Sequence, residues 1–152
     1  MTRNKITIRP FYIMRSQNHG KDSTGHDREG AILATGRVVV TWVTNTNDSH
    51  GSFSDLDGLK ALCGADDRTR FVFAEDDPNW HLKTFYLERT QDITGNTGKG
   101  IVAEGVEFSN HWCILNWLGK PYSEFWYPTL QDIERIHSHG GLTKIIWDDR
   151  AN

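Results

Sequence analysis

Hydrophobic and polar positions follow the same order twice along the chain. Residues 11–18 (FYIMRSQN) line up with residues 85–92 (FYLERTQD) at an offset of 74, with four identical positions. The apolar stretches 38–43 and 113–118 match next, and their tryptophans coincide. Residues 53–73 then match residues 127–147, again at an offset of 74. Because three blocks match in the same order, the chain is predicted to be an internal tandem duplication.

Each copy shows the same series of expected elements. Apolar runs bounded by turn residues predict four strands, clearest in copy two at 85–90, 101–108, 112–118 and 124–127. A three-residue spacing of apolar positions then predicts a short helix in each copy. The residues that carry it are Leu56, Leu59 and Leu62 in copy one, and Leu130, Ile133 and Ile136 in copy two. A last strand ends each copy, at 70–74 and 144–147.

These elements predict a mostly β fold with short helices (α+β), built from two β-β-β-β-α-β units. Each unit is expected to be a small Src-homology-3-like barrel or a twisted sheet. The expected lobes are residues 1–76 and 85–152, joined by a linker at 77–84. A unit of about 65 residues buries only about 60% of the surface of its unfolded chain, so we expect the two copies to pack on each other.

Aromatic residues are expected in two roles. Those that match between the copies are expected in the core: Phe11/Phe85, Tyr12/Tyr86, Trp42/Trp117 and Phe73/Trp147. Trp112, Tyr122 and Trp126 have no aromatic counterpart in copy one. In a strand, Trp126 points to the face opposite Phe125 and Tyr127, so at least one large ring is hard to bury. We expect Trp112, Tyr122 and Trp126 to contribute to an exposed aromatic patch, either for a protein partner or for packing on copy one.

Two charged positions occur in both copies, Arg15/Arg89 and Glu29/Glu104. One explanation is a partly buried Arg–Glu pair repeated in each lobe. The other is a binding site that is repeated twice. Arg89 and Glu104 are therefore candidate binding residues.

His137 and His139 form the sharpest cluster of chemically active side chains, at the end of the second helix. Both reach one metal ion only from an extended backbone, and a third ligand would come from Glu134, Asp148 or Asp149. The alternative is electrostatic, because a histidine near a helix C-terminus interacts favourably with the helix dipole. His137 and His139 are candidate binding residues, and no catalytic residue, metal or cofactor is assigned.

Charge and composition narrow the classes of partner. The chain has 17 Lys and Arg against 20 Asp and Glu, a net charge of −3, and a pI near 6.1. A surface that is basic throughout is excluded, so duplex DNA is a poor default partner. No apolar run approaches the roughly 18 residues of a membrane span, and no apolar stretch at the start resembles a signal peptide, so a cytoplasmic protein is expected. Cys63 and Cys113 are expected to be buried thiols, being too few for a disulfide framework.

The second copy carries a family resemblance. Residues 98–108 (GKGIVAEGVEF), 114–117 (ILNW), 132–141 (DIERIHSHGG) and 143–147 (TKIIW) resemble short uncharacterised proteins of bacteriophages and prophages. The resemblance implies a small phage or mobile-element protein, located in the host cytoplasm, and brings no activity with it. Copy one departs from the pattern, because Cys63-Gly64-Ala65 replaces His137-Ser138-His139.

The leading expectation is a non-enzymatic binding protein that recognises and inhibits a host macromolecule, specifically a protein of a bacterial defence or regulatory system. The sequence is also compatible with a homodimer. A first alternative is a nucleic-acid or nucleotide-binding protein that uses the groove between the lobes, although net acidity argues against it. A second alternative is a small metal-dependent hydrolase centred on His137, His139 and Asp148.

Overall fold

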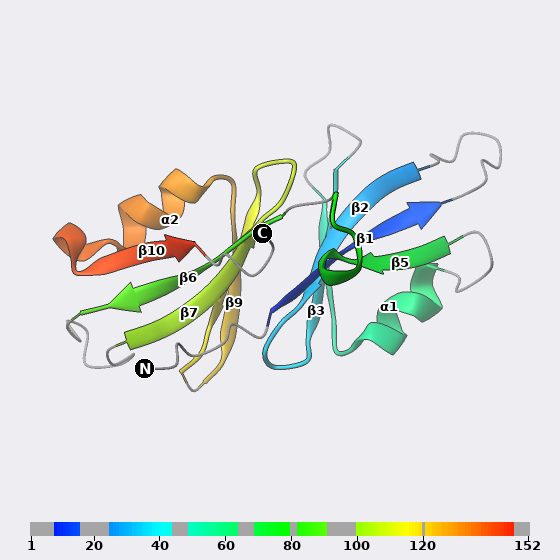
Figure 1. Cartoon of the computed structure of the whole chain (residues 1–152). Coiled ribbons are helices and arrows are strands. Elements are labelled where there is room, and N and C mark those ends of the chain that lie inside the picture. The colour runs from blue at the N-terminus through cyan, green and yellow to red at the C-terminus, as the bar shows by residue number, and fades with distance from the viewer. Residues whose placement is uncertain are drawn as a thin grey trace. The chain divides into compact units, whose positions relative to one another are not determined.

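The computed structural model describes residues 8–15, 25–43, 49–63, 69–79, 82–90, 100–119 and 121–147 of the 152-residue chain. The side chains of residues 15, 25–27, 63 and 139 lie outside the described part. Contacts divide the chain into a first unit, Arg9–His81, and a second unit, Leu82–Asn152 with Met1–Ile8 (Figure 1). Each unit is described by itself below.

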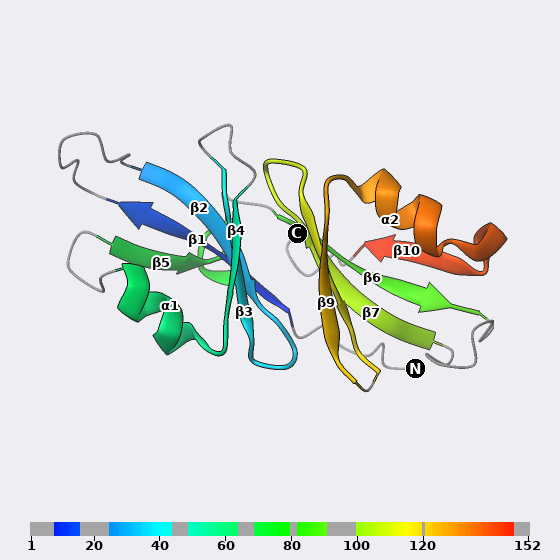
Figure 2. The same ribbon diagram turned by 180° about the vertical axis from the view of Figure 1, so that it is seen from behind.

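The first unit is a five-stranded antiparallel sheet with one short helix (Figure 2). Its strands are β1 (Arg9–Arg15), β2 (Gly25–Ile32), β3 (Val38–Trp42), β4 (His50–Phe53) and β5 (Thr69–Phe73). The helix is α1 (Leu56–Cys63), and a 3-10 turn, η1 (Ala74–Asp76), follows β5. The strands lie in the order β4-β3-β2-β1-β5.

The second unit repeats this plan. Its strands are β6 (Lys83–Arg89), β7 (Gly100–Glu107), β8 (Cys113–Trp117), β9 (Ser123–Tyr127) and β10 (Thr143–Trp147). The helix is α2 (Leu130–His137), followed by the 3-10 turn η2 (His139–Gly141). The order β10-β6-β7-β8-β9 is that of the first unit with each strand replaced by its match. Even the irregularity in the first strand recurs, between Ile13 and Met14 and between Leu87 and Glu88.

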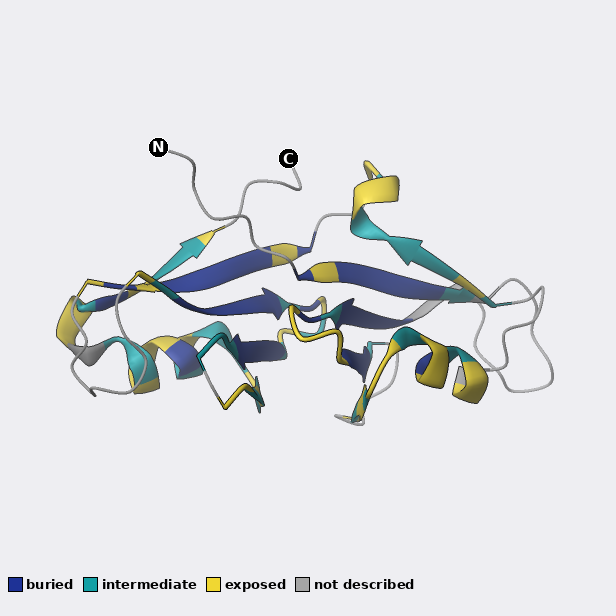
Figure 3. Ribbon diagram, turned by 90° about the horizontal axis from the view of Figure 1, so that it is seen from below, coloured by how far each residue is buried: buried dark blue, intermediate teal, exposed yellow. Residues whose placement is uncertain are grey.

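The mostly β class, the short helices and the duplication are therefore confirmed. In the described residues β4 and β5 are the edges of one sheet, and β9 and β10 are the edges of the other. Each unit is accordingly described as a sheet with a helix along one side, not as a closed barrel (Figure 3).

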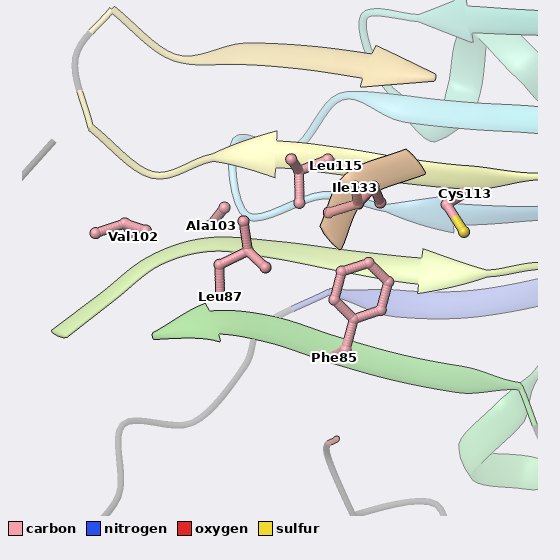
Figure 4. Packing of buried hydrophobic residues seen from close by; sticks show 7 residues of the cluster. All are labelled: Phe85, Leu87, Val102, Ala103, Cys113, Leu115 and Ile133. Atoms are coloured by element: carbon pink, nitrogen blue, oxygen red, sulfur yellow. The ribbon is translucent and has the colours of Figure 1, made fainter. Parts of the chain in front are cut away.

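Each helix covers the face of its sheet that carries the apolar core, because alternate side chains of a strand point to the same face. In the second unit the buried cluster consists of Phe85, Leu87, Val102, Ala103, Cys113, Leu115 and Ile133 (Figure 4). In the first unit it consists of Phe11, Ile13, Val38, Val40 and Leu59. The predicted core positions of Phe11 and Phe85 are thus confirmed. Trp147 differs, since it lies on edge strand β10 and keeps 43% of its surface exposed.

One glycine in each copy makes room for the core phenylalanine. A Cβ on Gly105 would lie 2.5 Å from the Ile114 carbonyl oxygen and 2.5 Å from Cζ of Phe85. A Cβ on Gly30 would meet the Val39 carbonyl and lie 2.6 Å from Cζ of Phe11. The ring and the neighbouring strand therefore leave no space for a side chain at either position.

The third apolar position of each predicted helix is not in the core. Leu62 is 72% exposed and Ile136 is 46% exposed, whereas Leu59 and Ile133 are buried. At about 100° per residue, the sixth position after the first residue is rotated by about 120° from it, so a repeated three-residue spacing leaves the buried face. The seventh position is rotated by only about 20° from the first and stays on it. In α2, that position is His137.

Candidate functional site

The second unit has a groove between α2 and β10, with a volume of about 600 Å³. Its apolar lining comes from Leu87, Ile133 and Ile145. Its polar and charged lining comes from Gln131, Glu134, Arg135, His137, Ser138, Thr143 and Lys144. The lining is therefore mostly polar, with three apolar side chains.

His137 lies among aromatic rings on the helix-covered face of the sheet. Its Nε2 is 2.9 Å from the Tyr127 hydroxyl oxygen, which is a hydrogen-bond distance. Its ring also meets Trp117 edge-on, with centroids 5.1 Å apart. Burial raises the pKa of Tyr127, so this hydroxyl keeps its proton at neutral pH. His137 therefore joins α2 to β8 and β9 at one end of the groove. Copy one has Phe53 and Cys63 at the positions of Tyr127 and His137.

Arg89 ends β6 on the same face. Its Nε donates a hydrogen bond of 3.0 Å to the hydroxyl of Thr143, and its guanidinium carbon lies 5.9 Å from the Trp117 ring centroid. Arg89 is buried and Thr143 lines the groove. The positive charge of Arg89 therefore lies near the end of the groove that His137 lines.

The predicted pair between Arg89 and Glu104 is wrong. Glu104 lies opposite Tyr86 in the strand register, whereas Arg89 lies opposite Gly100. Alternation along β6 places Arg89 on the face of Leu87 and places Tyr86, with Glu104, on the other face. Glu104 instead accepts a hydrogen bond of 3.4 Å from the side-chain amide of Asn116. The side chain of Arg15, which was expected to repeat the pair, lies outside the described part.

The repeated glutamates belong to a polar row on the face that the helix does not cover. Glu29 lies between Tyr12 and Thr41 in the register of the first unit, as Glu104 lies between Tyr86 and Asn116 in the second. Both carboxylates are buried. The Tyr12 hydroxyl donates a 2.7 Å hydrogen bond to Asp77, and this contact, with burial, raises the pKa of Tyr12.

The aromatic residues named from the sequence lie on and around β9. Tyr122 is 52% exposed, while Trp112 and Trp126 are half-buried. Trp126 packs on Phe108, with ring centroids 5.9 Å apart. Phe125 lies on the face opposite Trp126, as its register partner Leu115 shows, and is 50% exposed.

The metal site considered from the sequence lies only partly within the described residues. Within the described ranges, His, Cys, Asp and Glu side chains form no group of three or more that could hold a metal ion. The side chain of His139 and residues Asp148 and Asp149 lie outside those ranges. The alternative of a metal ion bound by His137 and His139 therefore depends on groups outside the described residues.

Sequence reasoning missed the groove itself. The signal was present in the comparison of the two copies, because Ile145 stands where copy one has Phe71. In the first unit, Phe71 packs on Phe11 at 5.6 Å and Lys60 lies over its ring at 5.6 Å. Ile145 therefore lines the groove at the position where the first unit carries an aromatic ring.

Within the described residues, neither helix is long and apolar enough to cross a membrane.

Comparison with known proteins identifies the family. The family model described as "Acb5 phage protein" matches residues 8–75 and, a second time, residues 82–149. The two matches begin 74 residues apart, which is the offset of the internal repeat, so the resemblance extends to copy one. No curated protein and no solved structure matched the chain. Because the two matches together span most of its length, the chain belongs to the Acb5 phage protein family.

Proposed function

We propose that this protein acts against a bacterial defence system by binding and inhibiting one of the host's defence proteins, without catalysing a reaction. Membership of a phage family supports the first part, since the letters Acb in the family name stand for anti-CBASS, which points to the CBASS defence of bacteria. The structure supports the second part through exposed apolar side chains.

Exposed apolar side chains concentrate in the second unit. Five large hydrophobic side chains in the described part of the chain are strongly exposed, and four of them belong to that unit: Tyr122, Phe125, Ile136 and Trp147. Apolar side chains in the centre of an interface supply much of the binding free energy between proteins, and aromatic rings are enriched there. This concentration is the observation that carries the proposed mode of action.

Ile136 and Phe125 are the residues to test first. Ile136 lies about 160° around α2 from Glu134, so it occupies the flank of the helix away from the groove. Phe125 points to the helix-covered side of the sheet but does not belong to the buried cluster. Substituting both by serine removes apolar contact area without opening a cavity in the core.

The test measures plating of a phage on bacteria that carry CBASS. A phage without its own copy of this gene should plate poorly, and expression of the wild-type protein should restore plaques. The double variant Phe125→Ser/Ile136→Ser should plate less efficiently than the wild type, because a loss of about 1.4 kcal/mol of binding free energy weakens the affinity for the host protein tenfold.

Leu62→Ser is the matched control, since Leu62 occupies the position of Ile136 in the first unit and is 72% exposed. It should plate like the wild type, and circular dichroism should show that all variants are folded. If the wild-type protein fails to restore plaques, the anti-defence role is wrong. If the double variant restores them fully, these side chains are not the binding surface.

A further inference from the structure

Strand β10 is an edge of its sheet, and this edge adjoins the groove. In the described part of the chain β10 pairs with β6 alone. An edge strand presents backbone N–H and C=O groups along its outer side, which makes it a template for another strand. Lysines and short length protect many edges, and β10 is short, with Lys144 near its start.

The register of β10 shows which groups point outward. The Thr90 N–H donates to the Leu142 carbonyl at 2.9 Å, which marks these two residues as a hydrogen-bonded pair. Pairs alternate along an antiparallel ladder, so Lys144 and Ile146 direct their backbone groups toward β6. Thr143, Ile145 and Trp147 direct theirs away from it. The Thr143 N–H accordingly bonds to the Ser138 carbonyl at 3.0 Å.

The groove offers places for side chains next to these outward groups. Ile145 contributes both its outward backbone and part of the apolar lining, together with Leu87 and Ile133. A strand added beside β10 would point every second side chain toward the helix-covered face, where the groove lies. The groove and the edge therefore fit one extended peptide better than they fit a folded surface.

Charge around the groove does not select an acidic or a basic peptide. Arg135 and Glu134 both line it, and Asp132 engages Arg135 at 3.3 Å. Lys144 lies opposite Glu88 in the register of β10 and β6, and strand alternation directs its side chain to the face opposite that of Ile145. The occupant is therefore defined by backbone pairing and by apolar side chains at alternate positions.

We propose that β10 and the adjoining groove bind an extended peptide segment of a partner protein by strand addition, with apolar side chains at alternate positions of the peptide. The proposal rests on the proposed function in one respect, namely that the partner is a protein. The peptide pairs with the outward groups of Ile145 and Trp147. Its alternate apolar side chains lie on Ile133 and Ile145.

The test selects binders from a library of random eight-residue peptides displayed on yeast, using the purified full chain. Enriched peptides should carry apolar residues at alternate positions and no central proline. One of them is then synthesised and its Kd measured by fluorescence polarisation. In ¹H–¹⁵N spectra, the amides of Ile145 and Trp147 should shift on addition of this peptide.

Ile145→Phe fills the groove with the side chain that copy one carries, so the fold has a precedent for it. This variant should bind the peptide at least tenfold more weakly. Phe71→Ile in the first unit is the matched control and should leave the Kd unchanged. Methylating the peptide nitrogen that pairs with the Ile145 carbonyl should abolish binding, while methylating the next nitrogen should not.

Three results would overturn the proposal: no enriched peptide, a folded Ile145→Phe variant that binds equally well, or mononucleotides that shift the groove amides when peptides do not. Each of these is separable from the proposed function, because the plating experiment uses Phe125 and Ile136, which do not line the groove. Restored plaques without peptide binding would leave the anti-defence role in place and remove strand addition.

Discussion

His137 connects the end of helix α2 to the sheet of the second unit. It lies on the buried side of α2, and its contacts with Tyr127 and Trp117 hold the end of the helix against the sheet. In copy one the matching residue is Cys63 and the matching hydroxyl is absent, because Phe53 replaces Tyr127. The pair is thus specific to the unit that contains the groove.

Cys113 gives a prediction at the same scale. Burial, with smaller effects of Glu107 and Asp132, raises the pKa of its thiol to about 12. Only the thiolate reacts with iodoacetamide, so in the Cys63→Ala background alkylation at pH 8 should be about a thousandfold slower in the folded protein than in urea. Mass spectrometry over time measures this ratio. Equal rates in the two conditions would mean that Cys113 is accessible.

The same thiol has a consequence for stability against pH. An unfolded cysteine ionises near pH 8.5, whereas the folded thiol stays neutral until about pH 12. The unfolded state therefore loses its proton first, and the contribution of Cys113 to stability falls as the pH rises above about 8.5.

At the scale of elements, helix α2 is held at its start by Thr129. The Thr129 hydroxyl oxygen accepts from the Asp132 N–H at 3.3 Å, and the hydroxyl donates to the Asp132 carboxylate at 2.9 Å. This hydrogen bond is the main cause that lowers the pKa of Asp132. Thr129 is therefore the N-cap of α2, and both of its bonds depend on one hydroxyl.

Thr129→Ala should lower the free energy of unfolding by about 1 kcal/mol at pH 7. Because the folded pKa of Asp132 is depressed, its contribution is present above the usual value of 3.8 and is lost as the pH falls through the folded pKa. The difference between wild type and variant should therefore shrink in acid. Urea unfolding at several pH values measures this, and Thr129→Ser, which keeps the hydroxyl, should behave as wild type. A constant difference at every pH would argue against the role of Asp132.

The strands and helices were largely predictable from the sequence. Which side chains of each element face the core was less predictable. Apolar runs bounded by turn residues predict the strands, and the 74-residue offset between the copies shows which strands match. The three-residue spacing of Leu130, Ile133 and Ile136 identifies α2 but misplaces Ile136, since a helix turns by about 100° per residue. The Arg89–Glu104 pair failed for a similar reason, because sequence alone does not give the register that separates them. The volume left by Ile145 depends on packing, so the groove could be found only in three dimensions.

At the scale of the whole molecule, both units contain the same contact between a glycine and a core phenylalanine. A glycine within the second strand of each unit, Gly30 in β2 and Gly105 in β7, lies against the phenylalanine ring at the centre of the core. Both copies carry a glycine at this position, and the contacts with the ring and the neighbouring carbonyl exclude a side chain.

Gly105→Ala and Gly30→Ala should each lower the free energy of unfolding by roughly 1 to 3 kcal/mol, because the added methyl group overlaps a carbonyl and an aromatic ring. Gly119→Ala is the control. A Cβ there has no atom within 4 Å, so the change should stay within about 0.5 kcal/mol. Tryptophan fluorescence in urea measures all three. If Gly105→Ala is as stable as the control, the ring of Phe85 does not hold its position.

The replacement of an aromatic ring by Ile145 also bears on how such a chain diversifies. Replacing a large side chain by a smaller one in a packed core normally lowers the free energy of unfolding. Here a second, filled version of the same core is encoded in the same chain, with Phe71 in place. The two copies therefore keep the same strand order and the same core phenylalanine, while they differ in the size of the side chain at this one position.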